Sequence, residues 1–257
     1  MSEPTASSYQ PNFKDNSINN SKGYSPDEDE ALNFLFSETP ATYNEAQDSE
    51  TECLLCEEPN SDSFLKIDKV NIRNSKAYKK SRCLLVINDV FVRKYISRFS
   101  RTNDQMIQAA RSVKQNLVEG AYDGVTSKET EIKLFNVARG SLHELLEDYI
   151  DFLDNNNLSK WEFGDARLTR TRQKLITEMN PEWYASIPEK CSAGTCANII
   201  ITLIYQVDSM IKGLLEKCER DFITNGGLRE TMSKYRISAR NNQKKYLNPN
   251  SGKTDSK

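Results

Sequence analysis

Residues 100–120, which read SRTNDQMIQAARSVKQNLVEG, decide the fold class of this 257-residue chain. Apolar residues recur in this stretch at intervals of three and four, which places them on one face of a helix. That face consists of Met106, Ala110, Val113 and Leu117. Thr102 followed by Gln105 is typical of a capping box that opens a helix, and Gly120 is a residue type that often ends one. The stretch therefore predicts an amphipathic helix.

The neighbouring stretches have the same period. A helix is predicted from about Tyr78, with an apolar stripe formed by Leu84, Ile87, Phe91, Tyr95 and Phe99. After residue 120, Thr126 with Glu129 predicts another capping box and a third long helix that ends near residues 155–157. The side chains expected to be buried there are Leu134, Val137, Ala138, Leu142, Leu145, Tyr149 and Phe152.

A polar connector follows, with a helix predicted from about Asp165 to Glu178 and stopped by Pro181. The fourth long helix is predicted from about Ala193 to residues 225–227. No alternating β pattern is found, so we predict an all-α protein with an up-and-down four-helix bundle over residues 78–224. A short helical suffix is expected at 225–242, within which the helix runs from about 228 to 240, and a disordered basic tail at 243–257.

Charge divides the chain strongly, although its formal net charge is only −2. Residues 1–68 hold 15 Asp/Glu and 3 Lys/Arg, a net of −12, and residues 69–257 hold the opposing +10. The acidic part is rich in Ser, Asn and Pro and has no sustained period, so a disordered acidic tail is expected at 1–70. Within it, residues 27–36 join an acidic run to an apolar cluster that could fold against a partner, although a solvated tail with a few apolar residues is the favoured interpretation.

Localisation is expected to be cytoplasmic, without a membrane span. The N-terminus shows no basic leader followed by an apolar core. The longest apolar stretch lies within 197–215 but includes Asn198, Gln206, Asp208 and Lys212, which favours a buried helix. Six cysteines without a secretion signal are expected to be reduced thiols.

Two sequence blocks carry a resemblance to a known family. Ala109, Ala110, Ser112, Asn116, Glu119 and Gly120 match an Ala-Ala, Ser, Asn-x-x-Glu-Gly pattern, and residues 126–146 match the helix after it. Together they resemble the bacterial four helix bundle protein family, which includes ribosomal RNA intervening-sequence proteins and a retroelement accessory protein. The Ser-Arg-Thr opening, the Thr-Ser-Lys block and Gly226-Gly227 resemble the branch with a four helix bundle suffix domain. The resemblance implies homo-oligomers, pentameric in characterised relatives, and nucleic-acid binding.

Basic side chains supply the candidate binding site. Lys/Arg residues recur at helical spacing along the first helix and continue on the second, and phosphate contacts require such clustering. The candidate nucleic-acid-binding residues are Lys94, Arg98, Arg101, Arg111 and Lys114. The suffix adds Arg229, Lys234, Arg236, Arg240, Lys244 and Lys245. We expect contact with RNA or DNA by charge rather than base readout; a protein scaffold that docks a nucleic-acid enzyme is the alternative.

Other chemistry has weaker support in the sequence. No nucleophile motif, P-loop or dinucleotide fingerprint is present, so no enzymatic activity and no cofactor are expected. Cys53 and Cys56 have the spacing of half a zinc site, but an incidental pair is the favoured interpretation and no metal is expected. Structural roles are expected for the polar and small residues of the family pattern and the next helix, with Glu119 paired to Arg139. These residues are Asn116, Glu119, Gly120, Arg139 and Ser141.

Overall fold

The computed structural model describes residues 32–33, 36–37 and 72–247, and this part of the chain is all-helical, without a strand. A 3-10 turn, η2 (Ile72–Asn74), precedes seven α-helices. Their bounds are α2 (Lys76–Tyr95), α3 (Arg101–Asp123), α4 (Lys128–Asn155), α5 (Ala166–Thr177), α6 (Pro181–Lys190), α7 (Ala193–Asn225) and α8 (Leu228–Leu247).

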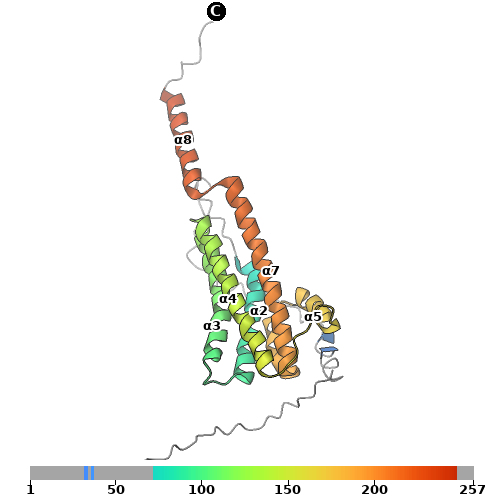
Figure 1. Ribbon diagram of the computed structural model, residues 1–257. Coiled ribbons are helices and arrows are strands. Elements are labelled where there is room, and N and C mark those ends of the chain that lie inside the picture. The colour runs from blue at the N-terminus through green and yellow to red at the C-terminus, as the bar shows by residue number, and fades with distance from the viewer. Residues whose placement is uncertain (1–31, 34–35, 38–71, 248–257) are drawn as a thin grey trace, which may run out of the picture.

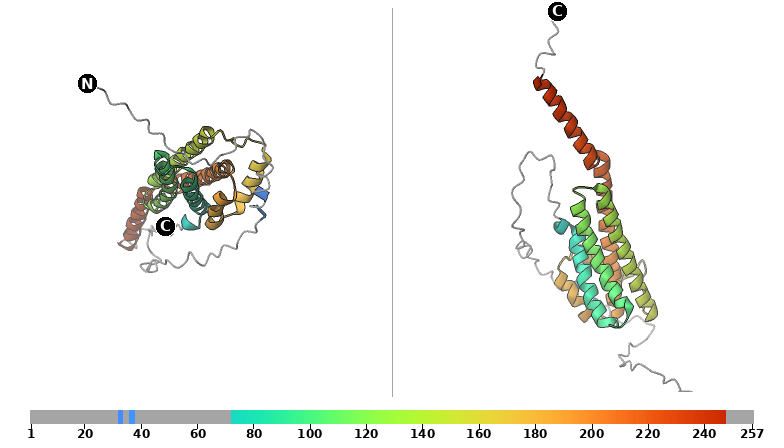
Figure 2. Two further views of the ribbon diagram at one scale, coloured as in Figure 1. Left: turned by 90° about the horizontal axis from the view of Figure 1, so that it is seen from below. Right: turned by 90° about the vertical axis from the view of Figure 1, so that its left-hand side faces the viewer.

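Four long helices, α2, α3, α4 and α7, lie side by side, and each runs opposite to the neighbours it contacts (Figure 1). Helix α3 packs between α2 and α4, and α7 packs against both α4 and α2. The shorter α6 covers the outside of α2, and α5 lies along α7. Helix α8 continues beyond the end of α7 and projects away from the packed helices (Figures 1 and 2).

The packed faces follow the predicted periods. Leu84, Ile87 and Phe91 of α2 are fully buried, as are Met106, Ala110, Val113 and Leu117 of α3. Burial of each such side chain contributes about 1.5–3 kcal/mol relative to leaving it in water. A polar link ties three helices together inside this core: the Tyr149 hydroxyl donates to Asn88 Oδ1 at 2.9 Å, and Asn88 Nδ2 donates to Met106 O at 3.1 Å.

Two predicted apolar contacts are wrong. Phe99 is fully exposed, because α2 ends at Tyr95 and the following residues no longer keep the helical period. Val137 is half-exposed, whereas its neighbours Phe135 and Ala138 are buried. The apolar side chain at 137 therefore lies at the edge of the face of α4 that contacts α3 and α7.

The helix ends also differ from the predicted capping boxes. Ser100, not Thr102, caps α3 by accepting from Thr102 N, and Ser127, not Thr126, caps α4 by accepting from Thr130 N. Ser100 precedes the predicted cap Thr102 by two residues, and Ser127 follows the predicted cap Thr126 by one. A serine hydroxyl can accept from the first-turn N–H groups as well as a threonine hydroxyl can, so the sequence pattern did not fix which residue is the cap. Gly120 does not end α3, which continues to Asp123.

Helix α6 was not predicted, because Pro181 was interpreted as the stop of the preceding helix. Pro181 is instead the first residue of α6, a position where its missing N–H has no intrahelical partner to lose. Asn180 caps the new helix by accepting from Glu182 N. The last helix is also longer than expected: α8 continues to Leu247, so residues 243–247 of the predicted disordered tail are helical.

Helix α7 is the most apolar element. Residues 193–224 are long and apolar enough, by length and composition, to cross a membrane. The same test is passed by core helices, and 56% of the most apolar window is buried against other helices in this fold. Gly226 ends the helix at φ 74°, a left-handed conformation that favours glycine, as the Asn-Gly-Gly signal predicted.

Part of the predicted disordered tail packs on the helices. Leu32 is buried in the hydrophobic core, and Phe36 is packed against it. Both residues are helical, and this segment lies beside α5 (Figure 1). The prediction of a disordered tail is wrong for these positions; residues 1–31, 34–35, 38–71 and 248–257 lie outside the described part of the chain.

Candidate nucleic-acid interface

Lys94 does not lie with the other predicted basic residues. Its Nζ donates to Pro188 O at 2.6 Å and lies 3.5 Å from the Glu189 carboxylate, so it joins α2 to the end of α6. Asn88, in contrast, is on the side of α2 that approaches α3, where it donates to Met106 O. The ammonium group of Lys94 is thus already bound by a backbone carbonyl and a carboxylate of the same chain.

The remaining four predicted cations lie at the α2–α3 connection and on α3. Arg98 is exposed in the connection, and Arg101 is the exposed first residue of α3. Arg111 is exposed and Lys114 is half-buried, two to four turns further along the same helix. None of the four forms an ion pair with the residues that the structure describes, which leaves them available to anions in solution.

Helix α8 is the most basic exposed element. Its 20 residues include Arg229, Lys234, Arg236 and Arg240, all exposed, and a single acidic residue, Glu230. Lys244 and Lys245 add two more basic residues to its sequence. The helix projects past the end of α7 (Figure 2), so its described cations can be approached from several sides.

The two basic regions are at opposite ends of the molecule. The α2–α3 connection lies at one end of the long helices, and α8 extends from the other end (Figures 1 and 2). The sequence analysis added the suffix cations to those of the first two helices, but the directions of the helices place the two sets far apart. Linear spacing along the chain could not reveal this separation, because it depends on the tertiary arrangement.

The predicted structural residues form two separate contacts. Asn116 Nδ2 donates to Ser112 O at 2.9 Å, and Ser141 Oγ donates to Ser112 Oγ at 2.9 Å across the α3–α4 contact. Gly120 lies against α4 as well: a Cβ there would be 2.8 Å from the Phe135 ring. Ser112 and Gly120 thus lie on the face of α3 that α4 approaches closely.

Arg139 does not pair with Glu119, which is exposed. Its Nε donates to Asp208 Oδ1 at 2.7 Å and its Nη2 donates to Asp208 Oδ2 at 3.3 Å, a two-point ion pair between α4 and α7. The hydrogen bond that Arg139 donates to the Asp208 carboxylate raises the pKa of Arg139 above its ordinary value. The exposed His143 lies 4.0 Å from the same carboxylate.

A buried polar cluster was missed by the sequence analysis. Lys80 is fully buried, and its Nζ donates to Leu175 O, Glu178 O and the Tyr184 hydroxyl, the last at 2.8 Å. These carbonyls belong to the end of α5, so the ammonium caps that helix from α2. Burial lowers the pKa of Lys80 to about 8 and raises the pKa of the nearby Cys83 thiol to about 12. A lysine within a run of basic residues gives no sequence signal of burial.

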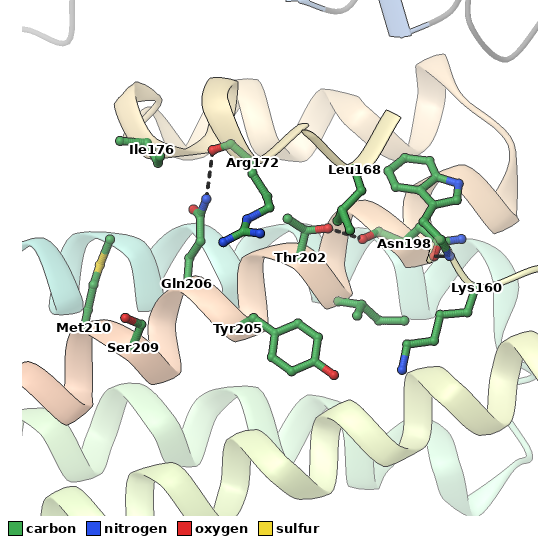
Figure 3. Close-up of a pocket in the computed structure, with 12 residues that line it drawn as sticks. Lys160, Leu168, Arg172, Ile176, Asn198, Thr202, Tyr205, Gln206, Ser209 and Met210 are labelled. Atoms are coloured by element: carbon green, nitrogen blue, oxygen red, sulfur yellow. Dashed lines mark hydrogen bonds between the residues drawn. The ribbon is translucent and has the colours of Figure 1, made fainter. Parts of the chain in front are cut away.

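A pocket of about 520 Å³ lies between α5 and α7 (Figure 3). Its apolar wall includes Trp161, Leu168 and Ile201, and the cations Lys160 and Arg172 extend over it (Figure 3). Gln206 donates from Nε2 to Arg172 O at 3.0 Å, while its buried Oε1 has no hydrogen-bond partner among the described residues. No acidic residue lines the pocket. An apolar wall with two cations suits a ligand that has an apolar body and an anionic group.

The described residues contain no group of three or more His, Cys, Asp or Glu side chains that could hold a metal ion. Cys83, Cys191, Cys196 and Cys218 are free thiols. Cys53 and Cys56, the predicted incidental pair, lie outside the described residues.

Comparisons with protein-family models, with curated proteins and with solved structures found no match for this chain. The candidate interface is therefore defined by its own geometry: exposed cations on α8, and a second exposed set around the α2–α3 connection.

Proposed function

We propose that the chain is a non-enzymatic, cytoplasmic helical module that binds RNA or DNA through its phosphates, with α8 as the principal contact. The observation that carries the proposal is the exposure of Arg229, Lys234, Arg236 and Arg240 on one projecting helix with a single acidic residue. Helices of this kind place several positive charges along a phosphate backbone at once, and each contact releases bound counterions. Affinity from this source is independent of base sequence.

We infer that α2, α3, α4 and α7 act as an up-and-down four-helix bundle and that α8 is its suffix. Their mutual contacts and alternating directions support this assignment. The resemblance of residues 100–146 to the four helix bundle protein family gives the same arrangement. In this proposal, the bundle is the rigid body that carries and orients the basic helix.

Self-association is the second part of the proposal. Large apolar side chains are exposed at the end of α7 and on α8: Phe222, Ile223, Met232, Tyr235 and Ile237. Met232 and Tyr235 are three residues apart and share one helix face. A helix of 20 residues with few apolar groups is marginal by itself in water, so contact between copies would stabilise it. A ring of copies, pentameric by the family resemblance, would repeat the basic sites and add avidity.

The same apolar side chains favour the alternative function, a scaffold that docks another protein without touching nucleic acid. Exposed aromatic and aliphatic groups are common in protein interfaces. The two functions differ in the dependence of binding on salt, because only phosphate contact is coupled to counterion release.

The experiment compares full-length protein with a variant in which Arg229, Lys234, Arg236 and Arg240 are changed to Gln. Binding to a labelled 30-nucleotide RNA and to duplex DNA is measured by fluorescence anisotropy from low to high salt. We expect the wild type to show a steep fall of log affinity with log salt, and the variant to lose about 3 units of that slope, since each lost phosphate contact removes about 0.7–0.9. An unchanged slope in the variant contradicts the assignment to α8.

A matched control carries four changes at the other end of the molecule: Arg98, Arg101, Arg111 and Lys114 to Gln. This variant removes the same charge, so a nonspecific effect of net charge would weaken binding equally. We expect a smaller loss of slope than for the α8 variant.

Light scattering of the same samples, with the ratio of absorbance at nucleic-acid and protein wavelengths, gives the oligomeric mass and any copurified nucleic acid. A monomer that binds no nucleic acid at low salt contradicts the whole proposal.

A further inference from the structure

Residues 32–33 and 36–37, which the structure describes, contact the surface formed by α5 and α6. Leu32 is only 1% exposed, and Phe36, four residues later, stacks on Trp183 of α6 with ring centroids 6.4 Å apart and planes 28° apart. Residues four apart lie on the same face of a helix, so both side chains can enter one surface together. The surface thus accepts two apolar side chains at helical spacing.

Polar and charged groups surround the apolar contact. Asn33 Oδ1 accepts from Arg170 Nη1 of α5 at 2.8 Å. Helix α5 carries Arg167, Arg170, Arg172 and Lys174 and no acidic residue. The sequence immediately before Leu32 is Asp27-Glu28-Asp29-Glu30. In the sequence, this acidic run precedes Leu32 and Phe36. Its charge is opposite to that of α5, and the two apolar side chains suit the apolar surface that includes Trp183.

One buried donor at this surface remains without an acceptor. The indole N–H of Trp183 is buried and has no hydrogen-bond partner among the described residues. A buried N–H that lacks an acceptor costs about as much as a lost hydrogen bond. A carboxylate or carbonyl on a helix seated against Trp183 would supply that acceptor.

The attachment of the chain's own segment is local. Its described contacts are those of Leu32, Asn33, Phe36 and Ser37, and residues 38–71 separate it from η2 in the sequence. A ligand segment tethered within the same chain acts at an effective concentration that is set by its linker and is commonly in the millimolar range. A partner segment with a better sequence can compete with a ligand held at that concentration.

We propose that the α5–α6 surface is a docking site for a partner protein, and that the partner presents an acidic amphipathic helix with Leu and Phe four residues apart. The chain's own segment fills the site until the partner displaces it. This surface is distinct from α8, so docking and nucleic-acid binding are separable functions of the molecule.

The test uses a labelled peptide with the sequence of residues 24–40 and full-length protein in which the own segment is disabled by Leu32→Asp and Phe36→Ala. We expect the peptide to bind this variant about 10- to 100-fold more tightly than wild-type protein, in which the tethered segment competes. A peptide with the same two substitutions is the control and should not bind. Equal affinity for variant and wild type, or no binding to a folded variant, overturns the proposal.

Two further variants locate the site and guard against misfolding. Adding Arg170→Glu to the variant with the disabled segment should weaken its affinity for the peptide at least several-fold. Adding Arg236→Glu, on α8, should leave the peptide affinity unchanged. Equal effects of the two substitutions would contradict the location of the site on α5. Circular dichroism checks the helical content of each variant. If the double variant loses helix, Phe36→Ala alone replaces it, with an expected gain of a few-fold in peptide affinity over wild type, and absence of that gain is equally decisive.

Discussion

At the scale of single residues, Gly120 shows how a residue expected to end a helix instead sets the distance between two helices. It lies inside α3, and the Phe135 ring of α4 occupies the space that a side chain at 120 would need. Gly140 is the useful comparison, because it lies inside α4 and a Cβ there would meet nothing within 4 Å.

We expect Gly120→Ala to destabilise the protein by about 1–3 kcal/mol, because the clash with Phe135 outweighs the gain in helix propensity. Gly140→Ala should instead stabilise it by about 0.5–1 kcal/mol, since only the propensity changes. Urea unfolding followed by circular dichroism measures both. If both substitutions changed the unfolding free energy in the same direction, the close approach of α3 and α4 at Gly120 would be wrong.

Lys80 is the other residue whose environment gives a measurable prediction. Its folded-state pKa of about 8 lies below its ordinary value of 10.5. Between these values the unfolded chain binds more protons than the folded chain, so stability rises as pH increases from 8 to 10.5. Below pH 8 both states are protonated and the contribution is constant.

The difference in unfolding free energy between wild type and Lys80→Met should therefore grow by up to about 3 kcal/mol over this range, as two and a half pKa units imply. Unfolding is measured at pH 7, 8, 9 and 10. At pH 7 the variant should already be less stable, because the carbonyls of Leu175 and Glu178 lose their donor. Lys76→Met, at an exposed site, is the control and should show no such trend.

At the scale of helices, α4 and α7 are joined by the ion pair of Arg139 and Asp208 rather than through Glu119. Both charged side chains are about a quarter to a third exposed, so solvent weakens the attraction. Two parallel hydrogen bonds in one plane still make it stronger than a single surface contact.

A double-mutant cycle between Arg139→Ala and Asp208→Ala should give a coupling energy of about 1 kcal/mol. The parallel cycle with Glu119→Ala should give a value near zero, within about 0.5 kcal/mol. Chemical denaturation of the three single and two double variants supplies the data. A larger coupling for Glu119 would restore the pairing expected from sequence.

The sequence predicted the long helices well because their buried faces repeat every three or four residues, as in Met106, Ala110, Val113 and Leu117. It failed where identical residue types have two roles. Pro181 begins a helix although proline also ends helices, and Phe99 is exposed although its spacing continues the stripe of α2. Lys94 was predicted to be a solvent-facing cation and Lys80 was not singled out, yet both donate to carbonyls of distant residues. Such contacts depend on which helices become neighbours.

At the scale of the whole molecule, α8 is structurally separate from the packed helices. It is absent from the set of helices that pack against one another, and its described side chains are exposed. The candidate site could be predicted only in part: the suffix cations were identified from composition, but their separation from Arg98 and Arg101 follows from the directions of α2 and α7.

A stop codon after Gly227 should consequently leave the thermal midpoint of the remaining protein within about 2 °C of wild type, because few contacts of the core are lost. The oligomeric mass measured by light scattering should fall if the apolar side chains of α8 join the copies. A large drop in the midpoint would show that α8 packs against the helices in solution.

The length of α7 has one more consequence. Its 33 residues span about 50 Å, and the 20 residues of α8 add up to about 30 Å beyond them. A strand held along α8 is therefore out of reach of Arg98 and Arg101 on the same copy. Under the proposed function, one molecule would therefore hold two separate strands, or two distant parts of one strand, at its two ends and act as a spacer between them.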